Sequence, residues 1–163
     1  MIKRFIDQEF MTEGEAKYIE DAISNNESLI VAGHRSAGIR PLMATLMAVA
    51  KSKYKTVQVK GFDDLEKDDV EYFLIPGLDN IDFEELIAQA VAKPGISFVS
   101  LKEPEHPYSI MKILRNVFKE NQNTDKIYNM IECSKENDVP FVSKITKLQV
   151  NEKGRIVKED YQE

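Results

Sequence analysis

Residues 28–50 read Ser-Leu-Ile-Val-Ala-Gly-His-Arg-Ser-Ala-Gly-Ile-Arg-Pro-Leu-Met-Ala-Thr-Leu-Met-Ala-Val-Ala. The apolar run at 29–32 ends at Gly33, which predicts a buried strand that stops at a glycine. A short polar loop follows, and from Leu42 to Ala50 nearly all side chains are apolar. Such a helix is too apolar for the surface, so we expect it to be covered on most sides, as a helix is when it packs on a parallel sheet.

The loop between the strand and the helix has the glycine spacing of a phosphate-binding loop. Four residues separate Gly33 from Gly38, and in such loops the backbone amides and the following helix N-terminus face an anion. An active P-loop continues with Lys, which contacts the phosphates, and with Ser or Thr, which binds Mg²⁺. This chain has Ile39 and Arg40 there, and Pro41, which lacks an amide, disfavours helical backbone at Arg40.

Length and composition indicate one soluble domain. The chain has 163 residues, 42% of them hydrophobic, and no apolar run near the ~18 residues of a membrane span. Its first residues do not resemble a signal peptide, so we expect a cytoplasmic location and no membrane insertion. The net charge of -6 and the scattered basic residues argue against nucleic-acid binding. The single cysteine, Cys133, excludes an internal disulfide.

In the rest of the chain, predicted helices and strands alternate as far as about residue 120, and only strands are predicted after it. Thr12 and Glu15 have the spacing of a capping box for a helix over 13–25. Further strands are predicted at 55–61, 70–75 and 96–101, and further helices at 81–92 and 108–120. Short strands joined by turns follow at 127–133, 141–150 and 156–157. This order predicts an α/β fold with a mostly parallel sheet, helices on both faces and a C-terminal antiparallel meander. The acidic stretch 62–71 lacks ligand spacing, so no metal site is expected there.

These segments, in this order, resemble the secretion and pilus traffic ATPases, the family that powers type II and type IV secretion and twitching pili. The family's lead-in helix, apolar strand, Walker A loop and buried helix correspond to 10–25, 28–32, 33–38 and 41–50. Its Walker B strand, acidic helix, turn and following strand correspond to 73–80, 83–92, 93–95 and 98–102. The resemblance covers most of 5–120 and implies a single RecA-like P-loop NTPase domain over 1–163. Its parts would be a lead-in helix (1–27), an α/β core (28–120) and a β-meander (126–158).

The departures from that family all remove groups that its members use for catalysis. Ile39 removes the phosphate-binding cation, and the guanidinium of Arg40 cannot bind Mg²⁺. Gly77 stands where the family has its catalytic Glu, with Asp79 close by as a weak substitute for the general base. Lys102 occupies the place of a family His. The resemblance therefore implies a degenerate, catalytically inactive relative that acts as an interaction or regulatory protein. Its partner would be a protein, in a homo-oligomer or a secretion-type or pilus-type assembly.

Two alternatives concern the same loop. The first is a binder of nucleotide or phosphate with little or no hydrolysis, in which ATP or phosphate would be held by the loop. Its candidate residues are Gly33, Arg35, Ser36, Ala37, Gly38 and Arg40. The second is a serine hydrolase, because the loop resembles a nucleophile elbow with one residue inserted and Ser36, Asp79 and His106 follow in hydrolase order. Otherwise we expect Ser36 to cap the following helix and His106 to lie exposed in its loop.

Overall fold

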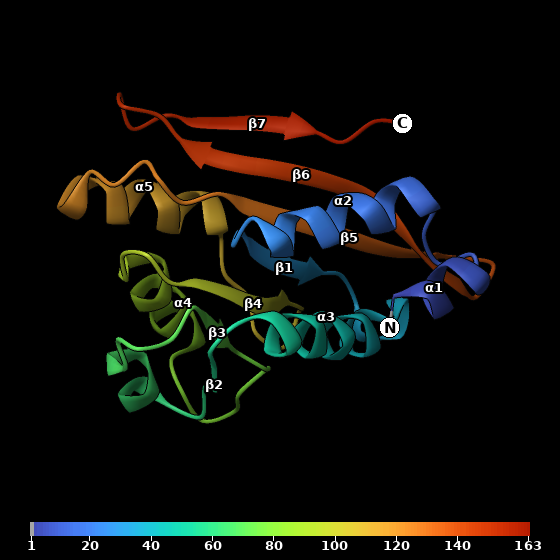
Figure 1. The fold of residues 1–163 in the computed structure, drawn as a ribbon, viewed down its shortest axis with the longest axis horizontal. Helices are drawn as coiled ribbons and strands as arrows, with labels where there is room; N and C mark the ends of the chain where they lie inside the picture. The colour runs from blue at the N-terminus through green and yellow to red at the C-terminus, as the bar shows by residue number, and fades with distance from the viewer. Residues whose placement is uncertain (1) are drawn as a thin grey trace.

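The computed structural model describes residues 2–163 and has a single seven-stranded sheet with helices on both faces (Figure 1). The strands are β1 (Ser28–Ala32), β2 (Thr56–Gln58), β3 (Tyr72–Leu74), β4 (Ser97–Lys102), β5 (Tyr128–Glu136), β6 (Val139–Val150) and β7 (Ile156–Asp160). The helices are α1 (Lys3–Asp7), α2 (Glu13–Ser24), α3 (Ile39–Lys53), α4 (Phe83–Ala92) and α5 (Ile110–Asn121), with 3₁₀ turns η1 (Arg35–Ala37) and η2 (Phe62–Glu66).

The sheet has the strand order β2-β3-β4-β1-β5-β6-β7. The first five strands in this order are parallel, and β1, the middle strand of the seven, lies between β4 and β5. The last two, β6 and β7, are antiparallel additions. The β5–β6 ladder shifts register between Glu132 and Cys133, which is where β5 passes the end of β1.

Two apolar layers fill the space between the sheet and its helices. Leu29 and Val31 of β1 face α1, α2 and α3, whereas Ile30 faces α4 and α5. This alternation is the period-2 pattern of a strand buried on both faces. Figure 1 shows α2 and α3 running alongside the strands, and α5 at the left of the view, beside the end of β6.

The prediction of a RecA-like P-loop NTPase domain is wrong. The chain is a small α/β domain built on one mixed sheet that ends in the antiparallel strands. At the position of the P-loop lysine, Ile39 is fully buried in the core. Phe10 packs against Gly38, so that a Cβ there would lie 2.9 Å from its ring. Because an aliphatic side chain at 39 is stabilised by burial, the start of α3 is drawn onto the sheet.

The start of α2 agrees with the prediction from sequence, whereas the start of α3 does not. Thr12 and Glu15 form the predicted capping box, with the Glu15 amide 3.0 Å from the Thr12 hydroxyl. The expected distortion by Pro41 is wrong, because α3 already begins at Ile39 and includes Arg40 in helical backbone. Pro41 lies in the first turn, where the backbone amides have no partner within the helix, so its missing amide costs no hydrogen bond. In residues 2–163 no helix has the length and apolarity to cross a membrane.

Candidate functional site

The connections around β1 and β4 leave a crevice at the carboxyl ends of the parallel strands. The chain leaves β1 through the Gly33–Gly38 loop into α3 on one face of the sheet, and leaves β4 through 103–109 into α5 on the other. Neighbouring strands whose connections depart to opposite faces define the switch point at which open α/β sheets bind ligands. The switch point of this sheet therefore lies between β1 and β4.

A cavity of about 360 Å³ occupies this switch point. It is lined by the ends of β1 and β4, the loop after β4 and the neighbouring part of β5, namely Ala32, Gly33, Lys102, Glu103, Pro104, Pro107, Met130, Glu132, Cys133 and Ser134. Its volume lies within the ~300–1,000 Å³ typical of small-molecule sites. The cavity is thus of ligand size and stands where the topology predicts one.

Lys102 and Glu132 face this cavity from opposite sides of β1. In the parallel ladders Ala32 is the register partner of both Lys102 and Glu132. In-register residues of neighbouring strands share a face, and strands lie ~4.8 Å apart, so the two backbones are about 9.6 Å apart with a methyl group between them. No ion pair or side-chain hydrogen bond joins either charged group to another residue within 2–163.

Behind the cavity, four charged or polar side chains form a connected network. Glu103 is buried at the end of β4 and accepts from Arg40 Nη2 at 2.5 Å and from Arg40 Nε at 3.4 Å. His106 places Nδ1 3.0 Å from Oε1 of Glu103 and Nε2 3.3 Å from Oδ1 of Asp79. The network joins the start of α3, the end of β4 and the loop after β3.

The ionisation of Glu103 is governed by opposing effects. Burial alone would raise the pKa of its carboxyl, but hydrogen bonds from Arg40 and His106 and their charges outweigh burial and lower the pKa below its ordinary value. Glu103 is therefore a carboxylate at neutral pH, committed to two donors. These hydrogen bonds hold the walls of the crevice in place. The Glu103 carboxylate is unsuited to act as a general base, because a general base must be free to accept a proton from a substrate within reach.

Gly77 is explained by the same network. A Cβ at this position would lie 3.1 Å from Cε1 of His106 and 3.2 Å from Oε1 of Glu103. A side chain at position 77 would therefore crowd His106 and Glu103, which would have to shift to accommodate it. His106 is 7% exposed and packs on the ring of Phe83 at a centroid distance of 5.0 Å, so the expectation of an exposed loop histidine is wrong.

The candidate residues of the Gly33–Gly38 loop interact mainly with one another and with the core. Ser36 donates its amide to Nδ1 of His34 at 3.1 Å, and its hydroxyl lies 2.9 Å from the same nitrogen. The expectation that Ser36 caps the next helix is wrong, since α3 has Gly38 at its N-cap. Ala37 is buried, whereas Arg35 is exposed. A Cβ at Gly33 would lie 2.6 Å from the carbonyl oxygen of Cys133.

Ser36, Asp79 and His106, the three residues of the hydrolase alternative, do not form one hydrogen-bonded chain. His106 and Asp79 do lie side by side, at 3.3 Å. The hydrogen-bond partner of Ser36 is His34, and the second nitrogen of His106 is held by Glu103. The structure thus joins Asp79 to His106 but gives Ser36 a different imidazole, one that lies within its own loop.

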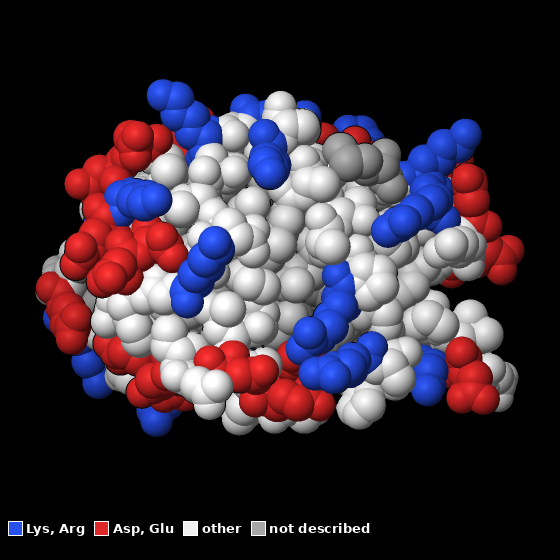
Figure 2. All heavy atoms as spheres, turned by 90° about the horizontal axis from the view of Figure 1, so that it is seen from below, with Lys and Arg blue, Asp and Glu red and all other residues white. Residues whose placement is uncertain are grey.

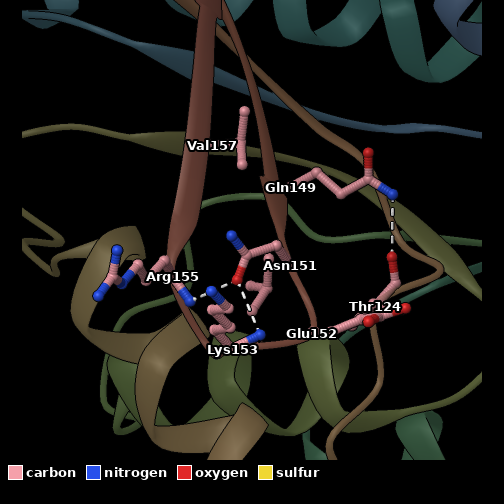
Figure 3. A pocket seen from close by; sticks show the side chains of 8 residues that line it. Thr124, Gln149, Asn151, Glu152, Lys153, Arg155 and Val157 are labelled. Carbon is pink, nitrogen blue, oxygen red and sulfur yellow. Dashed lines mark hydrogen bonds between the residues drawn. The ribbon is translucent and has the colours of Figure 1, made fainter.

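A second hollow, of about 590 Å³, lies near the β7 edge of the sheet, beside the β6–β7 turn (Figure 3). Its two amide side chains have partners nearby, and Gln149 donates to the carbonyl of Thr124 at 2.9 Å. Asn151 likewise accepts the amides of Lys153 and Arg155, at 2.9 and 3.0 Å. The dashed lines in Figure 3 mark these bonds, which stabilise a turn. This hollow is larger than the crevice, and its charged residues, Glu152, Lys153 and Arg155, are exposed on the turn.

Acidic side chains gather at one end of the face in Figure 2, the end at which α4 lies in Figure 1. The acidic stretch 62–71 forms η2 and the loop after it, where Lys67 and Lys93 lie 4.0 and 2.9 Å from Asp64 and Asp68. No group of three or more metal-binding side chains occurs in the described part of the chain. All acidic residues of this stretch except the half-buried Asp64 are exposed.

Few features of the sequence point to Glu103 and Glu132 as residues of a site. Both follow or interrupt apolar strand residues, and a charge at the end of a buried strand is the signal that could have drawn attention to them. The position of Glu132 opposite Lys102 depends on strand register, and His106, which holds Glu103, lies in a loop; neither arrangement follows from periodicity. Comparison with known proteins adds no relative, because neither a family model nor a curated protein matches this chain.

Proposed function

We propose that this protein binds a small charged molecule in the crevice between β1, β4 and β5 and does not hydrolyse nucleotides. The observation that carries the proposal is the pair of opposite charges, Lys102 and Glu132, that share one ligand-sized cavity without pairing with each other. Charged groups left without a partner in a concave site are the usual means by which a pocket fixes the orientation of its ligand.

The network behind the crevice supports a binding role by making its walls rigid. Glu103 lines the cavity and is anchored to α3 through Arg40 and to its own loop through His106. A binding site is most precise when its residues are locked by a second layer of hydrogen bonds. The loop of 103–107 is thereby held in one position over the cavity.

A non-catalytic role agrees with the side chains at the positions where an ATPase would do its chemistry. Ile39 is buried, Arg40 is bound to Glu103, and Gly77 lies against His106. Loss of the lysine and the metal ligand removes the groups that stabilise charge during phosphoryl transfer. A distant relationship to the traffic ATPases, as an inactive protein with a protein partner, remains a prediction from sequence.

The proposal is tested by following backbone amide signals in nitrogen-15 NMR spectra. The probes are glycine, L-leucine, inorganic phosphate and ATP with Mg²⁺, each added separately. Binding at the crevice is expected to shift the amides of Gly33, Glu132 and Ser134 with at least one probe. The proposal fails if no probe shifts these amides, or if phosphate is released from ATP at a rate that the variant Asp79→Ala abolishes.

A further inference from the structure

We infer that the ligand of this crevice is a small zwitterion with an apolar arm, such as a free α-amino acid with an aliphatic side chain. This inference rests on the proposed function and names the class of ligand. It draws on the spacing of Lys102 and Glu132 and on a second hollow that continues from the first.

The two charges suit a ligand that carries both signs. Their backbones lie about 9.6 Å apart across Ala32, two strand spacings. A carboxylate bound by the lysine and an ammonium bound by the glutamate, each through a contact of ~2.8 Å, fit within that span when a single carbon joins them. A simple anion such as phosphate would satisfy Lys102 but would be repelled by Glu132.

The geometry of β5 aims Glu132 into the crevice. The register of the β5–β6 ladder shifts directly after Glu132, and the hydroxyl of Ser143 on β6 donates to the carbonyl oxygen of Glu132 at 3.1 Å. Bulges of this kind re-aim a side chain and are common beside binding sites. Lys102 is the last residue of β4, whereas β5 continues past Glu132 to Glu136 beside β6.

The apolar arm has a place beside Met130. A hollow of about 310 Å³ shares Met130 and Glu132 with the crevice and is also lined by Ile110, Met111 and Leu148. Met130 precedes Glu132 by two residues and so lies on the same face of β5, one pleat further from the strand end. Unbranched methionine side chains adapt to apolar groups of varied shape.

Apart from Glu132 and the exposed Lys158, the polar side chains of this second hollow are already paired. Thr146 donates to Asp160 at 3.0 Å, and Lys144 lies 3.7 Å from the same carboxylate. These groups gain little from a new polar ligand, so the part of the ligand that enters here is expected to be apolar. Lys102 and Glu132 therefore remain the polar anchors.

The inference is tested by titrating L-leucine into the full chain by calorimetry, beside two analogues that each lack one charge. Leucinamide lacks the carboxylate and 4-methylpentanoate lacks the ammonium. L-leucine is expected to bind roughly tenfold or more tightly than either analogue, because each lost contact is a charge-assisted hydrogen bond. Glycine is expected to bind more weakly than L-leucine, because it cannot reach the apolar hollow.

Variants connect the binding to the named residues. Lys102→Met and Glu132→Gln are each expected to weaken L-leucine binding roughly tenfold or more, whereas the exposed controls Lys119→Met and Glu20→Gln are expected to leave it unchanged. If a variant fails to fold, the comparison of analogues on the natural chain still decides the matter. Phosphate binding at the crevice without L-leucine binding would overturn this inference and leave the proposed function standing; binding of neither would overturn both.

Discussion

Glu103 and His106 are joined both through their side chains and through their backbones. Nδ1 of His106 lies 3.0 Å from Oε1 of Glu103, and the His106 amide donates to the Glu103 carbonyl at 2.9 Å. The loop between them, which contains two exposed residues, is thereby closed into a tight turn at the end of β4. Because Glu103 also binds Arg40, this turn connects the crevice to the start of α3.

Replacing the buried carboxylate should destabilise the fold. Glu103→Gln leaves Arg40 and His106 without their shared anion, and we expect the free energy of unfolding to fall by about 2–3 kcal/mol. Urea denaturation measures this change. The matched control is Glu105→Gln, two residues away and exposed, which should change stability by less than ~0.5 kcal/mol. Equal effects at the two positions would contradict the role given to Glu103.

The contribution of Glu103 should depend on pH. Its folded pKa is lowered below the ordinary value of 4.5, so the folded protein holds its proton less tightly than the unfolded chain does. The stabilisation is therefore complete above pH 4.5 and is lost as the pH falls through the lower folded pKa. The difference in unfolding free energy between the natural chain and Glu103→Gln should shrink on acidification. A difference that stays constant down to the acid transition would contradict this account.

The sequence could predict elements whose signals are local. β1 follows from an uninterrupted apolar run, and α2 from a capping box that closes within four residues. The five-residue helix α1 was missed because it has no side-chain cap and is too short to show a helical period. Neither neighbour of β1 follows it directly in the chain, so the strand order needs long-range contacts that single-sequence patterns do not contain.

The site was less predictable than the fold because loops carry no periodicity. Glu103 and His106 lie in a proline-broken segment that reads as exposed, yet both are buried because each satisfies the other. The placement of Lys102 and Glu132 on either side of Ala32 depends on the register of three strands. The predicted protein partner and oligomeric assembly remain predictions from sequence.

Adding a methyl group at Gly77 should strain the network. The new Cβ would lie 3.1 Å from a His106 ring that is held at both nitrogens and packed on Phe83, so the ring cannot move aside without losing contacts. Gly77→Ala is expected to lower the unfolding free energy by about 1–2 kcal/mol. Gly61→Ala is the control: a Cβ there meets nothing within 4 Å, and the change should be neutral or slightly stabilising. Thermal or urea unfolding measures the stability of both variants. If Gly77→Ala is as harmless as Gly61→Ala, the network around His106 can adjust to the methyl group and the predicted strain is wrong.

Lys126 should make stability rise with pH on the alkaline side. Its ammonium group donates to three carbonyls at the end of α4, those of Ala90, Val91 and Lys93, at 2.9–3.1 Å. Burial lowers its pKa from 10.5 to about 7, so between these values the unfolded chain binds a proton that the folded chain lacks. The free energy of unfolding therefore gains a term that increases with pH across this window. Relative to Lys126→Met, the natural chain should become more stable from pH 7 to 10.5, and a flat difference would contradict the lowered pKa.

The thiol of Cys133 should react only when the chain unfolds. Cys133 is 5% exposed on β5, and burial, followed by the charges of Glu15 and Glu132, raises its pKa to about 12. Because the thiolate is the reactive form, alkylation by iodoacetamide at mildly alkaline pH should be very slow in the folded protein and fast in urea. The same shift means that the folded chain holds this proton more tightly, so the thiol's contribution to stability falls as the pH rises from 9.0 toward 12. The alkylation rate against urea concentration should follow the unfolding curve, and rapid labelling without denaturant would mean that β5 opens locally beside the crevice.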